Sequence, residues 1–226
     1  MNILAVDTAT GSCSVAFIKD HRLIAEEVYT AGKTHSRHLM EIIDHILVRC
    51  ESTPADIDGI AVTRGPGTFT GLRIGLSTVK GLAAAINKPV AGVSSLAALA
   101  FPLMWCGNPV VAMIDARRGE IYHARFSGCE GSETVEKAMV SAPEEVVENL
   151  PERAILAGSG AVLYRDLWSR RRSDIRMAPE TAHVIRAASV GMLAMDRFEN
   201  QVSNAVEVLV PEYIRKSDAQ IHLGNC

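Results

Sequence analysis

The same local pattern opens both halves of the chain. Residues 3–7 (I-L-A-V-D) and residues 110–115 (V-V-A-M-I-D) are apolar runs that end in an aspartate. In each half a short turn and a second strand-like run follow, which is the pattern of a β-hairpin. The repetition predicts two lobes, each built on a hairpin with helices packed outside it, and it divides the chain into residues 1–104 and 105–226.

The order of the remaining elements favours an α/β fold. Apolar residues recur at helical spacing after Ser36, and a second helical pattern runs from Phe69 to Ile86, where N-K-P stops it. The expected order in the first half is β-β-β-α-β-α-β-α, and its last helix reaches Trp105. The second half should hold a hairpin, a polar loop, a short strand and two helices, at 110–126, 127–137, 154–157, 161–167 and 181–198. A two-lobed, actin-like fold needs this arrangement, and a doubly wound parallel sheet is the alternative.

Composition and charge disfavour several classes of function. Of the 226 residues, 48% are hydrophobic and 22% are charged, which is typical of a globular protein with a core. A net charge of −3 gives no overall positive field, so we do not expect tight RNA binding by this chain alone. Five widely spaced cysteines without a C-x-x-C pair predict reduced thiols. Asp7 interrupts the amino-terminal apolar run, which predicts a strand rather than a signal peptide and hence a soluble, cytoplasmic protein.

Two glycine-rich turns are candidate phosphate-binding loops. G-P-G from Gly65 to Gly67 and G-S-G from Gly158 to Gly160 each join a strand to a helix, where free backbone N–H groups favour an anion. Together with Asp7 they form a candidate, vestigial nucleotide site. A tight strand-to-helix turn needs glycine whether or not a ligand binds. Neither turn fits the Walker A or the dinucleotide-binding pattern.

Three motifs resemble the TsaB (YeaZ) family, the bacterial partner proteins of threonylcarbamoyladenosine synthesis. They are T-R-G-P-G-T-F-T-G-L-R-I-G-L-S-T-V-K-G-L-A at 63–83, I-L-A-V-D-T-A-T at 3–10 and D-A-R-R-G-E-I-Y at 115–122. The resemblance covers essentially the whole chain, and it implies a two-lobed actin/Hsp70/sugar-kinase-like (ASKHA) fold. It also implies a role in forming threonylcarbamoyladenosine at position 37 of tRNA. The implied partners are TsaD, a catalytic relative, and the ATPase TsaE, with tRNA contacted through the complex and a homodimer when the chain is alone.

The resemblance further implies that this chain lacks the metal site of its catalytic relative. In TsaD an H-x-E-G-H segment carries two histidine ligands one helical turn apart. That segment falls here on S-L-A-A-L, with Ser95 and Leu99 at the ligand positions and Ala97 at the acidic position. Leucine cannot bind a metal, and a lone hydroxyl is a poor ligand. We therefore expect a non-catalytic scaffold or activator with no metal, no cofactor and no catalytic residue.

The helix at 69–86 offers a surface for a partner. One apolar stripe is suited to packing on a sheet, and a second stripe of mainly small residues would let another helix approach closely. The resemblance implies that this helix and the one at 36–50 both contribute to an interface with a second copy or with TsaD. The alternative is that the helix at 36–50 of the same chain covers the second stripe. The expected interface residues are Leu39, Ile43, Leu47, Gly71, Gly75, Thr78 and Leu82.

Two other functions stay open at this point. A phosphotransferase of the sugar- or acetate-kinase type would use Asp7 and the glycine turns around ATP. A glycoprotease-like peptidase would need a nucleophile or metal site, for which the sequence offers no pattern. The segment D-A-R-R-G-E at 115–120 has the residue types of an acid/base site. An ion-paired turn, with Gly119 supplying an unusual backbone angle, explains the same residues.

Overall fold

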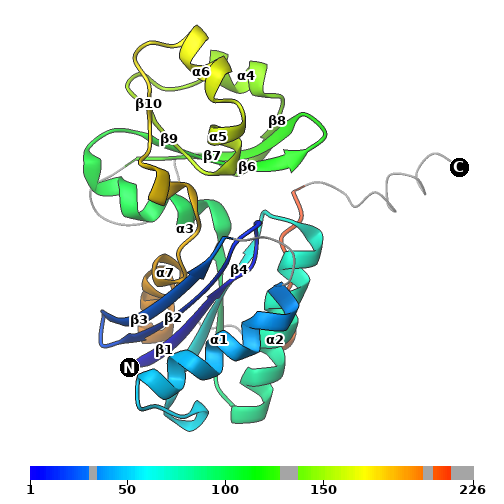
Figure 1. Ribbon diagram of the computed structural model, residues 1–226, viewed down its shortest axis with the longest axis vertical. Coiled ribbons are helices and arrows are strands. Elements are labelled where there is room, and N and C mark those ends of the chain that lie inside the picture. The colour runs from blue at the N-terminus through cyan, green and yellow to red at the C-terminus, as the bar shows by residue number, and fades with distance from the viewer. Residues whose placement is uncertain (31–34, 128–136, 201–205, 215–226) are drawn as a thin grey trace, which may run out of the picture.

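The computed structural model describes residues 1–30, 35–127, 137–200 and 206–214 (Figure 1). Two lobes are stacked along the long axis, each around a five-stranded sheet. Most of the polar loop expected at 127–137 lies outside the described residues. The two-lobed α/β architecture expected from the repeated pattern is confirmed.

The two sheets have the same topology. The first sheet has the order β3-β2-β1-β4-β5 and the second has the order β8-β7-β6-β9-β10. In both, the strand that ends in aspartate pairs antiparallel with the next strand of its hairpin and parallel with a later strand. The repeated sequence pattern therefore corresponds to a repeated strand arrangement. The strands are β1 (Asn2–Asp7), β2 (Cys13–Lys19), β3 (Arg22–Tyr29), β4 (Gly59–Gly65), β5 (Val90–Ser94), β6 (Val110–Arg117), β7 (Glu120–Phe126), β8 (Met139–Ser141), β9 (Ile155–Ala157) and β10 (Arg176–Met177).

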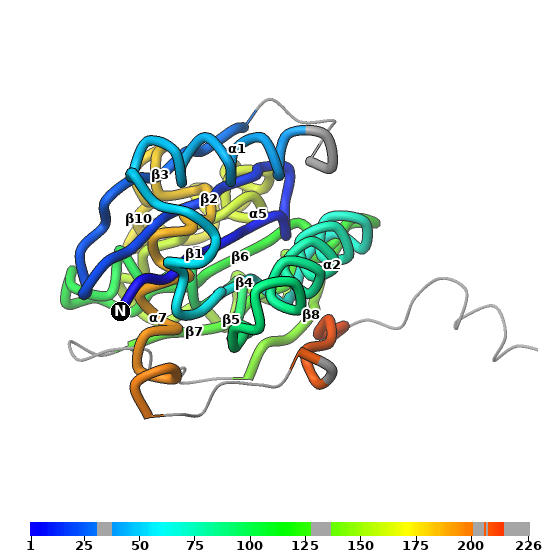
Figure 2. The backbone as a smooth tube through the Cα atoms, turned by 90° about the horizontal axis from the view of Figure 1, so that it is seen from below, coloured from blue at the N-terminus to red at the C-terminus, as the bar shows by residue number. Residues whose placement is uncertain are grey.

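Helices cover both faces of the first sheet. Helices α1 (His35–Arg49) and α2 (Phe69–Ile86) pack on one face, and α7 (Ala187–Glu199) packs on the other (Figure 2). The boundaries expected for α2 are confirmed. Its N-cap Thr68 accepts a hydrogen bond from the Gly71 N–H at 3.2 Å, and Asn87 ends the helix in the left-handed conformation just before Pro89.

The second lobe contains short elements that the sequence pattern did not reveal. These are β8, β10 and α4 (Pro143–Glu148), whose two to six residues are too few to show a period. Helices α4, α5 (Ser159–Leu163) and α6 (Arg165–Arg171) cover one face of the second sheet around a core that includes Trp168. The remaining short helices are η1 (Pro54–Asp56), η2 (Phe101–Cys106), η3 (Glu180–His183) and η4 (Val206–Val208).

The expected division between residues 104 and 105 does not separate the lobes. Helix α7 lies beyond that point in the sequence, yet it packs on β1, β2 and β4 of the first sheet. It also begins at Ala187, six residues later than expected, because η3 occupies the start of the expected range. Helix α3 (Ser95–Ala100) contacts both sheets and joins their apolar faces into one core. The chain therefore returns to the first lobe after building the second.

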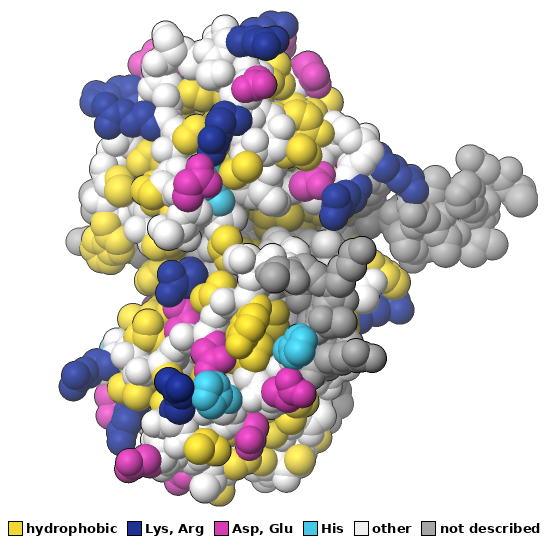
Figure 3. Space-filling model, viewed as in Figure 1, with side chains coloured by type: hydrophobic (Ala, Val, Ile, Leu, Met, Phe, Trp, Pro, Cys, Tyr) yellow, Lys and Arg dark blue, Asp and Glu magenta, His cyan; other side chains and the backbone are white. Residues whose placement is uncertain are grey.

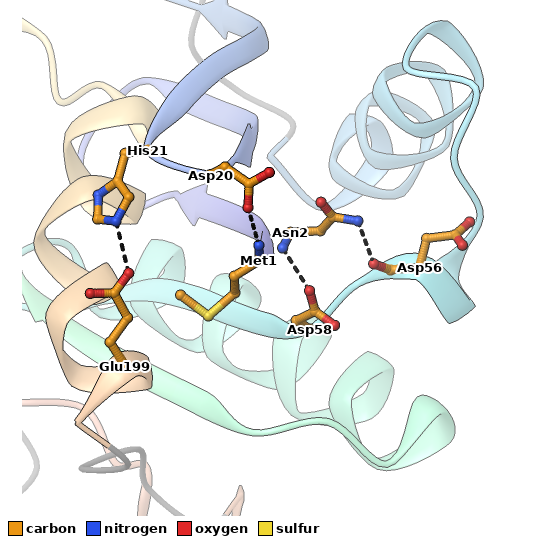
Figure 4. A network of polar contacts seen from close by, with 7 residues as sticks. All are labelled: Met1, Asn2, Asp20, His21, Asp56, Asp58 and Glu199. Carbon is orange, nitrogen blue, oxygen red and sulfur yellow. Dashed lines mark hydrogen bonds and ion pairs between the residues drawn. The ribbon is translucent and has the colours of Figure 1, made fainter.

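A polar network holds α7 and the amino terminus together at the end of the first sheet farthest from the second lobe (Figure 4). The Asn2 N–H donates to Asp58 at 2.7 Å, and the terminal ammonium group pairs with Asp20. His21 Nε2 lies 2.8 Å from a Glu199 carboxylate oxygen at the end of α7. These contacts fasten the start of β1, the β2–β3 turn and α7 to one another.

Candidate functional site

The most unusual polar group of the first lobe is the carboxyl group of Asp7, at the end of β1. Its side chain is fully buried. Oδ1 accepts hydrogen bonds from the Thr63 hydroxyl at 2.7 Å and from the Ala9 N–H at 3.1 Å. Oδ2 is buried and has no hydrogen-bond partner among the described residues. Ligands of open α/β sheets bind at this carboxyl edge, so Asp7 and Thr63 define the candidate site.

Burial changes the acid–base behaviour of this site. It raises the pKa of Asp7 to about 7, although the hydrogen bonds from Thr63 and Ala9 act in the opposite direction. Burial, and then the negative charge of Asp7, raise the pKa of the Cys13 thiol to about 12. A carboxyl group that titrates near neutral pH marks a candidate functional site, and Cys13 is a buried, unreactive thiol.

The turn that follows Asp7 is locked against the start of α2. The Thr8 hydroxyl donates to the Gly71 carbonyl at 2.7 Å, and the Thr68 N–H donates to the Ala9 carbonyl at 2.7 Å. A Cβ atom at Gly71 or Gly75 would overlap Thr8. Both glycines therefore serve a close contact within the chain and do not face outward, contrary to the role expected for them in a partner interface.

The apolar residues expected at that interface also point inward. Leu39, Ile43 and Leu47 of α1 are at most 4% exposed and belong to the core beneath α1 and α2. Only Thr78 and Leu82 of the expected set are partly exposed. An apolar stripe identifies the buried face of a helix, and here the chain's own first sheet covers that face.

Packing within the chain also accounts for the glycines of the two candidate phosphate loops. A Cβ atom would overlap the Glu212 carbonyl at Gly65, the Ala9 carbonyl at Gly67 and the Met113 carbonyl at Gly158. Gly65 and Gly158 have positive φ angles of 134° and 104°, which other residues rarely adopt. Gly160 is less restricted, with Met113 and Ile121 atoms 3.1 Å from a Cβ atom. Nucleotide binding at these turns stays a prediction.

Helix α3 carries residues 95–99, which we expected from the resemblance to lie at the position of the metal ligands of TsaD. Ser95 is fully buried, Ala97 is partly exposed and Leu99 is 1% exposed. The Leu99 side chain lies against Gly158, where a Cβ atom would overlap it. No three His, Cys, Asp or Glu side chains are grouped as metal ligands in the part of the chain that the structure describes. Ser94 caps α3 by accepting the Ala97 N–H at 3.3 Å.

The aspartate of the second lobe lies in a different environment. Asp115 accepts the Arg117 N–H at 2.8 Å and pairs with the Arg117 guanidinium at 3.2 Å. Its own N–H donates to the Ser159 hydroxyl at 3.1 Å. Gly119 has a φ of 78°. The ion-paired turn expected at 115–120 is confirmed.

The outer face of α1 carries two histidines that lie beside acidic side chains. His38 lies 3.1 Å from Glu41, and His45 pairs with Glu27 of β3. Figure 3 shows histidine, acidic and hydrophobic side chains interspersed over this helix. Both histidines therefore lie at the surface, each beside a carboxylate. None of the described helices is both long and apolar enough to span a membrane.

Two residues of the site were missed from the sequence, namely Thr8 and Thr63. The signal for Thr63 was available, because β1 and β4 are parallel neighbours and their carboxyl ends meet at one edge. Nothing in the sequence around Thr8 indicates that it packs against Gly71 and Gly75. That contact depends on the tertiary position of α2.

Comparison with known proteins identifies full-length relatives. The family model described as TsaD, tRNA N6-adenosine threonylcarbamoyltransferase, matches residues 27–223. The tRNA threonylcarbamoyladenosine biosynthesis protein TsaB of Escherichia coli K12 is 33% identical over 229 residues, which cover 97% of this chain and 96% of that protein. The protein of the same name from Bacillus subtilis 168 is 27% identical over 97% of this chain and 96% of its own length.

Solved structures give the same result for the fold. The structure of YeaZ from Pseudomonas aeruginosa is 29% identical and superposes with a TM-score of 0.82 over 94% of this chain and 99% of that one. The activator of the 2-hydroxyisocaproyl-CoA dehydratase from Clostridium difficile, solved with bound ADPNP, is only 8% identical and has a TM-score of 0.56 over 89% and 97%. That second likeness concerns the ASKHA fold alone. The chain therefore belongs to the TsaB (YeaZ) family and has its two-lobed, actin-like fold.

Proposed function

We propose that this chain is a non-catalytic subunit of the machinery that forms threonylcarbamoyladenosine at position 37 of tRNA. It acts by forming a heterodimer with TsaD in the cytoplasm. The observation that carries this proposal is the likeness, over almost the full length of both chains, to proteins named for threonylcarbamoyladenosine biosynthesis. The ATPase TsaE is the expected third subunit, and tRNA is bound through the complex.

The surroundings of α3 support a role without chemistry of its own. Leu99 fills the space beside Gly158, at the second of the two candidate phosphate-binding turns. A buried leucine offers no charge and no hydrogen bond to a ligand. Ser95 and Ala97 offer at most one hydroxyl group between them. The substrates are therefore assigned to the catalytic relative.

The exposed side of α1 and the partly exposed side of α2 form the proposed contact with TsaD. Met40 and Val48 lie two helical turns apart on α1 and are 51% and 66% exposed. Thr78 and Leu82 lie one turn apart on α2, and the two helices are in contact. Residues at this spacing share one side of each helix, as helix–helix recognition requires. This set replaces the buried residues expected from the sequence.

Substitutions on this surface test the proposal. The double variant Met40→Asp, Val48→Asp should fold like the unmodified chain, because both side chains point into solvent. It should bind purified TsaD at least a hundredfold more weakly in sedimentation or calorimetry. The control is Leu163→Asp, an equally exposed leucine on α5 of the second lobe. Unchanged binding by the double variant would remove this face from the interface.

The alternative function, a phosphotransferase, is tested by measuring ATP turnover by the same purified chain. An ATP-dependent phosphotransferase should turn over ATP when the chain is alone. A scaffold should show no ATP turnover above that of an Asp7→Asn variant. Turnover that requires Asp7 would favour the phosphotransferase and contradict the proposed role.

A further inference from the structure

The segment Val206–Ile214 lies on the first lobe, beside α2 and the strands β4 and β5. We name these nine residues the strap. The Glu212 N–H donates to the Arg64 carbonyl at 2.7 Å, and a Glu212 carboxylate oxygen lies 3.1 Å from the Arg64 guanidinium. Leu209 is 2% exposed and belongs to the core between the first sheet and α1 and α2. The strap is therefore anchored on its inner side by one backbone bond, one ion pair and one buried side chain.

Two glycines of the first sheet make room for the strap. A Cβ atom at Gly65 would overlap the Glu212 carbonyl oxygen. A Cβ atom at Gly92 of β5 would lie 2.8 Å from the nearest Leu209 methyl carbon, closer than side chains normally approach. Gly65 and Gly92 lie on neighbouring strands, and both are open on the side where the strap passes. The first sheet is thus shaped to receive this segment at two separate points.

An aromatic contact ties the far end of the strap to the first turns of α2. The rings of Tyr213 and Phe69 are stacked with their centroids 5.5 Å apart. The Arg73 guanidinium lies 3.7 Å from the centre of the Phe69 ring, and its Nε donates to the Tyr213 hydroxyl at 3.4 Å. Phe69 and Arg73 are one helical turn apart, so Tyr213 holds the amino-terminal turn of α2 from outside.

The amino-terminal turns of α2 are therefore held by contacts on two sides. On its inner side Gly71 and Gly75 are locked against Thr8, next to the buried strand β1. On its outer side the strap holds Phe69 and Arg73 through half-exposed contacts. The outer contacts are few and solvated, and such contacts open more readily than a buried core. The contacts of Tyr213 with Phe69 and Arg73 are therefore the part of this grip that opens most readily.

We propose that the strap clamps the amino-terminal turn of α2 and holds this helix in the position from which it binds a partner subunit. This inference rests on the proposed function, in which α2 contributes to the contact with TsaD. The clamp consists of the three strap residues that contact the sheet and α2, namely Leu209, Glu212 and Tyr213. We call these the inner residues of the strap. Its outer residues Val208 and Val210 are exposed and are not part of the clamp.

Hydrogen exchange of the unliganded chain tests the clamp without any partner. In the variant Leu209→Ser, Tyr213→Ala, the backbone amides of residues 67–73 should exchange at least tenfold faster than in the unmodified chain. Amides of the second lobe should be unaffected. The matched control is Val208→Ala, Val210→Ala, which changes the outer face of the same segment. Gly92→Ala tests the same contact from the side of the sheet, because the added methyl group would overlap the side chains of Leu209 and Arg64 while the strap sequence stays intact.

Capture of TsaD is the second readout, measured with the same variants after thermal melts confirm that each is folded. The clamp predicts at least tenfold weaker binding for the inner-face variant and for Gly92→Ala, with unchanged binding for the outer-face control. Unchanged exchange at residues 67–73 in the inner-face variant would overturn the clamp. Weaker binding by the outer-face control would show instead that the strap is itself a contact surface. If the unmodified chain does not bind TsaD, the proposed function is wrong. The hydrogen-exchange result still tests whether the strap stabilises the start of α2, because it needs no partner.

Discussion

Asp7 and Asp115 end equivalent strands of two sheets with the same topology, yet their surroundings differ. Asp7 is fully buried, accepts two hydrogen bonds on one oxygen and has a raised pKa. The Asp115 side chain is 18% exposed and paired with Arg117 in a turn. The repeated strand pattern therefore sets where each aspartate lies, whereas the residues that follow the aspartate determine its burial and its polar partners. In the first lobe T-A-T at 8–10 begins a turn that is hydrogen-bonded to the start of α2. In the second lobe A-R-R at 116–118 includes the Arg117 guanidinium, which pairs with Asp115.

The largest difference that we expect between the two lobes is in the loss of stability when a glycine is replaced, at Gly75 in the first lobe and at Gly119 in the second. Gly75→Arg places a long cation where a Cβ atom already overlaps the Thr8 hydroxyl. Overpacking and an unpaired buried charge together should cost several kcal/mol, enough to prevent recovery of a folded chain. In the second-lobe turn, Gly119→Ala meets open space and only the strain of a positive φ, so about 1 kcal/mol is expected.

Soluble yield and thermal melts of both variants measure this difference. A Gly75→Arg variant that melts at the same temperature as the unmodified chain would contradict the close packing of Gly75 against Thr8. That outcome would also restore Gly75 as an outward-facing residue.

The second expected effect is the contribution of the buried Asp7 carboxyl group to the pH dependence of stability. Because its pKa is about 7 in the folded chain and 3.8 in the reference state, the folded state binds a proton that the unfolded state has lost. The resulting stability is fully present below pH 3.8 and is lost as the pH rises through 7, by roughly 4 kcal/mol. Asp7→Asn should therefore gain stability relative to the unmodified chain as the pH increases from 4 to 8.

Chemical denaturation of both proteins across this pH range measures the difference. Thr63→Val sharpens the test, because loss of its hydrogen bond should raise the pKa of Asp7 and shift the transition to higher pH. A stability difference between Asp7→Asn and the unmodified chain that is constant from pH 4 to 8 would contradict the buried, neutral-range carboxyl group.

The smallest expected effect concerns the thiols. Cys13 is 3% exposed beside Asp7, whereas Cys106 at the end of η2 is exposed. A thiol reagent at pH 8 should label Cys106 within seconds to minutes and Cys13 only after unfolding. Mass spectrometry of the labelled peptides distinguishes the two sites. Rapid labelling of Cys13 in the folded chain would mean that the Asp7 site opens to solvent.

Much of the fold was predictable, because its signals are local. The apolar runs around Asp7 and Asp115, and the long amphipathic pattern from Phe69 to Ile86, predict strands and a helix that the structure confirms. The return of α7 to the first sheet was not predictable, because an apolar pattern does not indicate which of two sheets a helix packs on. The short elements β8 and α4 have too few residues to show a period.

The candidate site was predictable only in part. Asp7 was identified from its place at the end of a strand. The inward direction of Gly71, Gly75 and Leu39 was not, because a helix that is apolar on two sides does not reveal which side meets its own chain. The contact between Thr8 and α2 joins residues more than 60 positions apart, and no local pattern encodes it.

One measurement tests the central claim most directly, namely that the chain activates TsaD without performing chemistry itself. Threonylcarbamoyl transfer to tRNA is measured with TsaD and TsaE, with and without this chain, and with the Met40→Asp, Val48→Asp variant. We expect transfer that requires the chain, is lost with the interface variant and survives Asp115→Asn. Transfer that is unchanged when the chain is omitted would contradict it, as would transfer by the chain in the absence of TsaD.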